Sequence, residues 1–274
     1  MRPSGNASAS ARSVAIVVLT HSRVHLLREC VEHVLARVSP LTAEVVIWNN
    51  GSTDGTATYL DSLADPRIRV VHSDRNIGQN AYARAFRDTT AAYLVELDDD
   101  VVDAPDGWDE TLVDALERLP DVGFLAADLE DDPHDLAAHY RYRVRPGEYT
   151  EAVENGVRLL LGPTGGGCAM TPRAVYDQVG GFRENRRSVF WQEETAYIED
   201  IRAAGFRAAV LADLKVLHHG GAYYAGVSPE KAAYWAGWER RLRRRTAVKR
   251  VLFQLPFFRR LNARFGWVVE PTAS

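Results

Sequence analysis

Three consecutive carboxylates follow a short apolar run in the segment YLVELDDDV, residues 93–101. Because adjacent negative charges at the end of a buried strand repel one another and lose hydration, a cation is expected beside Asp98, Asp99 and Asp100. Oxygen ligands select hard ions such as Mg²⁺ or Mn²⁺, and Mg²⁺ is usually held by one or two carboxylates plus substrate phosphates. The triplet therefore favours a metal-bound nucleotide diphosphate, with an acidic, solvated turn as the alternative.

The residues around the triplet predict an α/β protein with a Rossmann-like, mostly parallel sheet. Apolar and β-branched runs predict buried strands at residues 14–19, 44–48, 67–72 and 92–97. The segments between them predict helices at residues 27–38, 56–64 and 80–89, the first closed by Pro40. Strands that alternate with helices indicate a sheet covered by helices on both faces.

Polar clusters follow the carboxyl ends of these strands, at residues 20–23, 49–54 and 98–100. Ligands of open parallel sheets bind beyond those strand ends. Each cluster alone could be a simple turn, because turns are rich in Asn, Gly, Ser and Asp for conformational reasons. Their convergence at one edge favours a nucleotide-binding cleft.

The composition is that of an ordinary globular chain of 274 residues, 46% hydrophobic and 26% charged. Two cysteines, Cys30 and Cys168, cannot build a disulfide framework and favour a reducing cytoplasm. No apolar run approaches the roughly 20 residues that cross a bilayer. Residues 1–12 lack the apolar centre of a secretory signal, so a disordered leader is expected there.

Positive charge is concentrated at the end of the chain. Residues 231–274 contain eleven Lys and Arg against two Glu, although the whole chain has a net charge of −4. A basic, amphipathic helical extension is expected at residues 223–274. Residues 235–264 either contact an anionic membrane surface, peripherally and on its inner face, or pack their apolar side on the body of the protein. Nucleic acid is not expected as a partner, because no nucleic-acid motif accompanies the basic run.

Seven segments, taken together, resemble family 2 glycosyltransferases of the GT-A fold. They are VAIVVLTHSR, VVIWNNGSTDGT, RNIGQNAYARAF, YLVELDDDV, GGGCAMTPRAVYDQVGGF, the pair Glu193 and Glu194 followed by AAGFRA, and VLHHGG. The resemblance extends from about residue 14 to residue 219, in the family's order. It implies a GT-A domain at residues 13–222, with a nucleotide-binding half at 13–103 and an acceptor half at 104–222. It also implies a nucleotide-diphosphate sugar donor, a hydroxyl acceptor, Mn²⁺ or Mg²⁺, and inversion at the anomeric carbon.

On the donor side, the resemblance assigns a role to each matching residue. Contacts to the nucleotide sugar are implied for Thr20, His21, Arg23, Asn49, Asn50, Arg75, Gly78, Asp98 and Asp99. Asn49 stands where the family usually has an Asp, which keeps a polar group but removes a charge. Asp98 and Asp100 match the DXD motif, and His218 matches the histidine that approaches the metal or diphosphate, with His219 as the alternative.

On the acceptor side, the resemblance implies a glycine-rich loop and a catalytic acid. Gly165, Gly166 and Gly167 permit close approach of a sugar, and Trp191 could lie beneath its ring. Thr171 and Pro172 are expected to begin a helix that Gly180 ends. Glu194 matches the catalytic base, which removes the proton of the acceptor hydroxyl. Its alternatives are Glu193, Glu199 and Asp200.

Two other functions remain open at this point. A sugar nucleotidyltransferase could share such a sheet and metal, but it would need a glycine-rich, basic phosphate loop, which LTHSRVHLLRE lacks. A catalytically inactive nucleotide-sugar-binding homologue is the second, because Asn49 and the acidic pair depart from the family pattern. The abundance of Ala and Arg indicates a GC-rich bacterium, in which glycan, lipid-linked and secondary-metabolite acceptors all occur.

Overall fold

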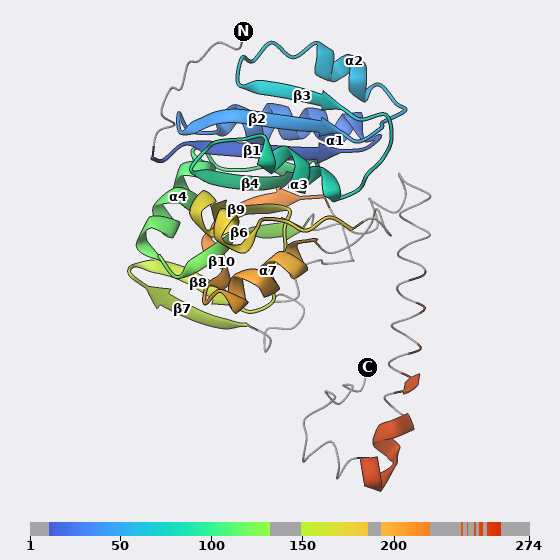
Figure 1. Ribbon diagram of the computed structural model, residues 1–274, viewed down its shortest axis with the longest axis vertical. Coiled ribbons are helices and arrows are strands. Elements are labelled where there is room, and N and C mark those ends of the chain that lie inside the picture. The colour runs from blue at the N-terminus through green and yellow to red at the C-terminus, as the bar shows by residue number, and fades with distance from the viewer. Residues whose placement is uncertain are drawn as a thin grey trace. The chain divides into compact units, whose positions relative to one another are not determined.

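The computed structural model describes residues 11–131, 149–185 and 193–219, and near the C-terminus positions 237, 240, 244, 247, 248 and 251–258 (Figure 1). The chain divides into two compact units, residues 1–220 and 221–274. Of the expected leader, residues 11 and 12 are described, and Arg12 forms ion pairs with Glu110 and Glu117. The finer domain boundaries at residues 13, 103 and 222 stay predictions.

The first part of unit 1 alternates strands and helices. The strands are β1 (Val14–Thr20), β2 (Thr42–Asn49), β3 (Ile68–His72) and β4 (Tyr93–Asp98), and the helices are α1 (Val24–Glu29), α2 (Thr56–Asp61) and α3 (Asn80–Arg87). After α1 the chain continues as a π-helical turn, Cys30–Val34, and a 3-10 turn, Leu35–Arg37. Helical backbone therefore reaches Arg37, and the predicted stop before Pro40 is confirmed.

The second part of unit 1 is richer in strands. Its elements are β5 (Val101–Asp103), α4 (Trp108–Arg118), β6 (Val122–Asp131), β7 (Thr150–Glu154), β8 (Val157–Leu161), β9 (Cys168–Pro172), α6 (Arg173–Val179), α7 (Glu193–Ala203) and β10 (Arg207–His218). Gly180, with φ of +83°, ends α6 in the left-handed conformation, as expected.

The expected helix start at Thr171 is wrong. Thr171 lies in β9, and α6 begins at Arg173. The Thr171 hydroxyl donates to the Gly123 carbonyl at 2.7 Å and lies 2.6 Å from the Tyr197 hydroxyl. Its side chain is buried, so the strand directs it into the core, away from the free amides of the helix.

All the described strands join one mixed sheet, in the order β3-β2-β1-β4-β9-β6-β10-β8-β7, with β5 on β10. β1 is parallel to β2 and β4, and β2 is parallel to β3. β9 is antiparallel to both β4 and β6, and β6 is parallel to β10. β10 therefore points in the same direction as β4, and the carboxyl ends of β1, β2, β4 and β10 lie at one edge.

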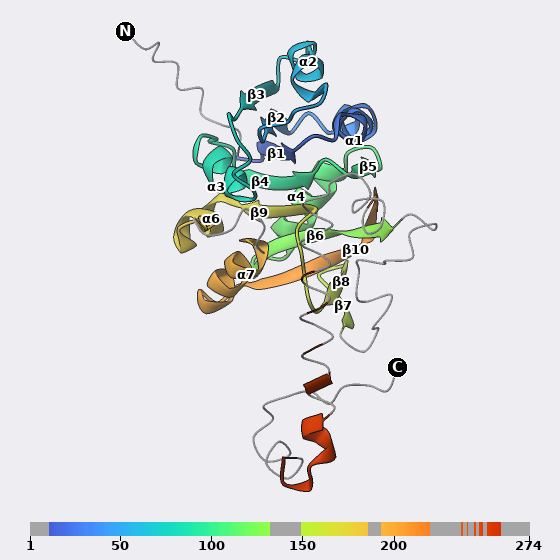
Figure 2. The same cartoon turned by 90° about the vertical axis from the view of Figure 1, so that its right-hand side faces the viewer.

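Two apolar cores cover the two faces of this sheet. One packs α1, α2 and α4 against Val14, Ile16 and Val18 of β1. The other packs α3, α6 and α7 against Ala15 and Val17 of the same strand. Figure 2 shows α3, α6 and α7 together on one side of the sheet and α1 on the other. The predicted class, a Rossmann-like sheet flanked by helices, is confirmed.

The second unit is described at few positions, nearly all of them helical. Val248, Val251, Leu255 and Phe257 are exposed, with Phe257 at 74%. Phe253 is buried and contacts Phe258 edge to face, with ring centroids 5.4 Å apart. In the described residues, no helix combines the length and apolar character needed to span a membrane.

Candidate active site

The polar clusters predicted at the strand ends meet at one edge of the sheet. Thr20 pairs with Asn49 of β2, and Leu19 pairs with Asp98 of β4. At the end of β10, the backbone N–H of His219 donates to the Asp100 carbonyl at 2.8 Å. This bond brings His218 to the acidic triplet from the opposite half of the sheet.

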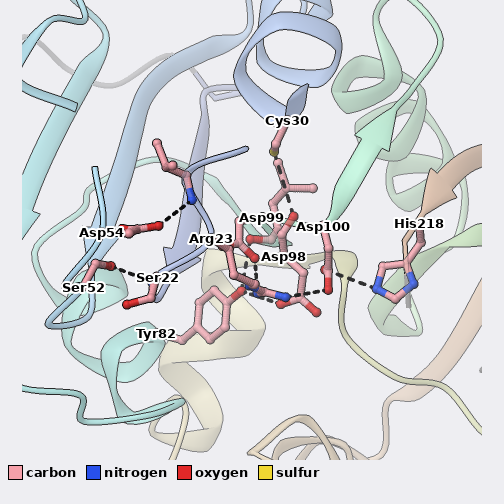
Figure 3. Close-up of polar contacts among 12 residues, drawn as sticks. Ser22, Arg23, Cys30, Ser52, Asp54, Tyr82, Asp98, Asp99, Asp100 and His218 are labelled. Atoms are coloured by element: carbon pink, nitrogen blue, oxygen red, sulfur yellow. Dashed lines mark hydrogen bonds and ion pairs between the residues drawn. The ribbon is translucent and has the colours of Figure 1, made fainter. Parts of the chain in front are cut away.

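Arg23 supplies a cation to the acidic triplet (Figure 3). Its Nη1 donates to Asp100 Oδ2 at 2.9 Å, and its Nη2 donates to Asp99 Oδ1. The side chains of Arg23 and Asp99 are 9% and 0% exposed. Arg23 was expected to contact the nucleotide, whereas the structure buries its guanidinium against the aspartates. Thr20 is also fully buried, with its backbone carbonyl accepting from Asn50.

Asp98, Asp100 and His218 form a group suited to holding a metal ion. One ligand atom from each residue lies within 4.8 Å of the others. His218 Nε2 is 3.3 Å from Asp100 Oδ1, and Asp98 Oδ1 accepts from the Tyr82 hydroxyl at 3.0 Å. Two carboxylates and an imidazole suit a divalent ion such as Mn²⁺. The role of Tyr82 was not predicted, because in sequence it is simply a buried residue of an amphipathic helix.

Burial affects the protonation of the acids around this group. It raises the pKa of Asp99 to about 7, an effect that the Arg23 guanidinium opposes and the Asp100 carboxylate reinforces. Burial also raises the pKa of Glu96 well above its usual value, and the nearby charges of Glu194 and Asp98 raise it further. Glu96 is therefore close enough to both carboxylates to feel their charges.

The loop after β1 is held in a strained conformation. Ser22 has a φ of +51°, which is uncommon for a residue with a side chain. Its N–H donates to the Ser52 hydroxyl at 2.8 Å, and its own hydroxyl accepts from the Thr53 N–H at 3.1 Å. Asp54 accepts from the N–H of Val24 at the start of α1. These bonds cross-link the loops after β1 and β2 (Figure 3).

Asn49 and Asn50, which were predicted to contact the nucleotide, also form hydrogen bonds to the loops after β2 and β3. Asn49 Oδ1 accepts from the Ser52 N–H, and its Nδ2 lies 3.0 Å from His72 Nδ1. Asn50 accepts from the Ile77 N–H at 2.8 Å and donates to the Gly78 carbonyl at 3.2 Å.

Three further residues of the predicted donor site lie around these loops. His21 Nδ1 is 2.9 Å from the Asn50 carbonyl oxygen. Gly78 has a φ of +61°, and Arg75 is exposed. The strand ends and these contacts thus bring the predicted donor residues together, and their contacts with a nucleotide stay predictions.

The predicted acceptor loop runs beside Glu96 and Asp98. The Gly167 carbonyl accepts from the Asp98 N–H at 2.8 Å. A Cβ on Gly166 would lie 2.1 Å from Glu96 Oε1, whereas a Cβ on Gly165 would meet nothing within 4 Å. Glu96 is 3% exposed, and neither of its carboxylate oxygens has a hydrogen-bond partner in the structure as described. Glu96 was not predicted as a site residue, because only its place before the aspartates distinguishes it in the sequence.

The predicted bases lie at the start of α7. Tyr197, Ile198 and Ile201 face the core. They follow Glu194 by three, four and seven residues, which is the spacing of one helix face. Glu194 is therefore on the sheet-facing side of the helix. Glu199 is exposed, and Asp200 forms an ion pair with Arg183. Trp191 and the side chain of Glu193 lie outside the described residues.

The two histidines at the end of β10 point to different partners. His218 is buried and faces Asp100. His219 Nε2 lies 3.9 Å from Glu29 Oε2 of α1. This geometry favours His218 over His219 as a metal ligand.

Comparison with known families identifies the chain. The model of glycosyl transferase family 2 matches residues 15–192. The chain belongs to glycosyl transferase family 2. The resemblance read from the seven sequence segments is thereby confirmed.

Two relatives each match about three quarters of this chain. The N-acetylglucosaminyl-diphospho-decaprenol L-rhamnosyltransferase of Mycobacterium tuberculosis is 26% identical over 74% of this chain and 75% of that protein. The protein y4gI of Sinorhizobium fredii is 26% identical over 75% of this chain. The chain spans about a quarter of the length of that second relative, 24%.

A solved structure shares the fold. It is the mannosyltransferase PcManGT of Pyrobaculum calidifontis, in complex with GDP-Man and Mn²⁺. The TM-score is 0.53 at 22% identity, over 75% of this chain and 56% of that one. The predicted GT-A fold of this family 2 protein is confirmed.

Proposed function

We propose that this protein is a metal-dependent, inverting glycosyltransferase that moves a sugar from a nucleotide-diphosphate donor to a hydroxyl acceptor. The observation that carries the proposal is the cluster of Asp98, Asp100 and His218 at the carboxyl edge of a family 2 fold. Asp100 and His218 are buried and Asp98 is half-buried, and the convergence of two carboxylates with an imidazole favours a bound cation because like charges repel one another.

Asp98, Asp100 and His218 would hold the divalent ion. When bound, such an ion neutralises charge that develops on the diphosphate leaving group. The imidazole ligand favours Mn²⁺ over Mg²⁺, since Mg²⁺ prefers oxygen ligands alone. Consistent with this, PcManGT was solved in complex with Mn²⁺ and GDP-Man.

Glu194 would act as the general base. From the sheet-facing side of α7 it would accept the proton of the acceptor hydroxyl while that oxygen attacks the anomeric carbon. The first turn of a helix favours the ionised form of a carboxylate, as this role requires. The loop with Gly165, Gly166 and Gly167 would lie along the acceptor, and His21, Asn49, Asn50 and Arg75 along the nucleotide.

The decisive experiment tests donor use directly. The protein is incubated with a panel of UDP-, GDP- and dTDP-sugars, with Mn²⁺, Mg²⁺ or EDTA, and release of nucleoside diphosphate is measured. We expect slow hydrolysis of one donor class that EDTA abolishes. A nucleotidyltransferase would instead release pyrophosphate from a nucleoside triphosphate and a sugar phosphate, and an inactive homologue would bind a donor without releasing anything.

Inversion is tested on the transferred sugar. With an acceptor in hand, the one-bond C1–H1 coupling constant, measured by NMR, reports the configuration of the new anomeric centre. A donor linked α should give a β product. Retention of the donor configuration would contradict the single-displacement role of Glu194.

We further propose that the C-terminal unit contacts an anionic membrane through residues 235–264, which suits a lipid-linked acceptor. Exposed Val248, Val251 and Phe257 lie in the basic segment, and arginine next to apolar residues favours anionic lipid surfaces. The Mycobacterium tuberculosis relative is named for a decaprenol-linked substrate. Deletion of residues 235–274 should abolish sedimentation with phosphatidylglycerol vesicles, and unchanged sedimentation would favour packing of the tail on the body.

A further inference from the structure

Arg23 and Asp99 form an ion pair that the predicted metal site does not use. Arg23 lies just before α1, and Asp99 follows β4. Their side chains are 9% and 0% exposed, so this is a fixed internal pair and differs from the surface ion pairs that contribute little. The same guanidinium reaches Asp100 Oδ2 at 2.9 Å, while Asp100 Oδ1 faces His218.

The pair lowers the negative charge of the acidic triplet. When ionised, Asp98, Asp99 and Asp100 carry three negative charges, and the Arg23 guanidinium offsets one of them. The negative charge of the triplet lies beside the oxygens of Asp98 and Asp100 that converge with His218. A divalent ion placed there would offset that charge, which favours its binding because uncompensated buried charge is costly.

We propose that the Arg23–Asp99 pair is an internal counter-charge that sets how strongly the cation site attracts a divalent ion, because Asp99 offsets the positive charge that Arg23 brings next to Asp100. The inference rests on the proposed function, because it concerns the same metal site. Arg23 and Asp99 act on the ion through their charges: Asp99 holds the guanidinium, and the guanidinium bonds one oxygen of Asp100 while the other faces His218.

The test is a double-mutant cycle on the full chain, with Mn²⁺ alone as the probe and no nucleotide. Wild type, Asp99→Asn, Arg23→Met and the double variant are compared at pH 8. Free Mn²⁺ is measured by electron paramagnetic resonance, and stability by thermal unfolding in EDTA. The Arg37→Met and Asp103→Asn variants are matched controls, because that ion pair is partly exposed, at 37% and 56%, and lies outside the cluster.

Opposite changes are expected from the single variants. Asp99→Asn leaves the positive charge of Arg23 in excess and should weaken Mn²⁺ binding about tenfold or more. Arg23→Met leaves an extra negative charge, which should lower the melting temperature in EDTA and tighten Mn²⁺ binding. The double variant has the wild-type net charge, and its affinity should return to within about threefold of wild type.

Compensation is the deciding result. If the double variant binds Mn²⁺ no better than Asp99→Asn, the counter-charge proposal is overturned, and this comparison holds even if Arg23→Met alone does not fold. Weaker binding in both single variants would overturn it as well. Wild type that binds no Mn²⁺ would contradict the proposed metal-dependent function itself, whereas binding without compensation would contradict the counter-charge alone.

Discussion

On the proposed donor side, the loops after β1, β2 and β3 hold one another through hydrogen bonds such as Ser22 to Ser52 and Asn50 to Ile77. On the proposed acceptor side, Glu96 is buried against Gly166 without a hydrogen-bond partner among the described residues. A satisfied network is rigid, whereas an unsatisfied buried group is costly and is retained mainly where function needs it. Under the proposed function, we therefore expect the linked loops to be formed before a donor binds, and the space around Glu96 to be completed by an acceptor.

The largest effect is expected from removing a metal ligand on the donor side. Asp100→Ala should lower transfer by about 10³-fold or more and abolish Mn²⁺-dependent nucleotide binding, because it removes preorganised charge next to the leaving group. Steady-state kinetics and titration calorimetry with nucleoside diphosphate measure both. Asp103→Asn, which changes an exposed acid three positions later, is the control and should behave as wild type. Retained turnover in Asp100→Ala would refute the metal assignment.

A variant on the proposed acceptor side should lose the transfer step while it keeps donor binding. Glu194→Gln should reduce kcat by about 10²-fold or more, which is the usual contribution of a general base. Donor affinity should stay near normal, because the change is isosteric and affects only the proton acceptor. The exposed Glu199→Gln variant, measured in parallel, should keep its activity. Full activity in Glu194→Gln would transfer the role to Glu193 or Asp200.

Removal of one side chain from the hydrogen-bonded loops after β1, β2 and β3 should lower the stability of the folded protein. Asn50→Ala leaves the Ile77 N–H and the Gly78 carbonyl without their partner, which should lower the free energy of unfolding by about 1–3 kcal/mol. Urea denaturation measures this loss. Asn50→Asp keeps the acceptor for Ile77 and should lose less. Equal stability of Asn50→Ala and wild type would contradict a donor site formed before binding.

A matched pair of glycine variants tests the acceptor loop. Gly166→Ala places a methyl group 2.1 Å from Glu96 Oε1, so the carboxyl or the loop must move, at a cost of about 1–3 kcal/mol. Gly165→Ala meets nothing within 4 Å and should change stability by less than about 0.5 kcal/mol. The acceptor KM should rise in the first variant alone. Identical behaviour of the two would show that the space around Glu96 is not restricted.

The smallest effect is a pH dependence at Glu96. Its folded pKa is raised well above 4.5, so at low pH both folded and unfolded chains are protonated there and stability is unaffected. As the pH rises, Glu96 ionises in the unfolded chain before it ionises in the folded chain. The free energy of unfolding therefore falls until the pH passes the folded pKa of Glu96. Glu96→Gln should therefore match wild type near pH 4.5 and melt at a higher temperature by pH 8, in EDTA. The exposed Glu151→Gln variant should show no such trend.

The sequence predicted the proximity of the proposed donor-side residues better than that of the proposed acceptor-side residues, for a physical reason. Strand ends in a parallel sheet necessarily meet, so Thr20, Asn49 and Asp98 could be placed together from the strand pattern alone. Glu96 and Tyr82 could not be recognised, because both lie within regular elements whose pattern indicates only burial. Their partners, Gly166 and Asp98, come from distant parts of the chain.

The sequence by itself determined the alternating strands and helices, the family, and the acidic triplet at the end of β4, because local periodicity and short motifs encode these features. Tertiary structure decided which cation meets which carboxylate. Arg23 and His218 are brought to Asp99 and Asp100 by loops and by the direction of β10, across separations that no local pattern records. Only the folded sheet shows that Arg23 pairs with two acids of the triplet and that Asp98, Asp100 and His218 converge.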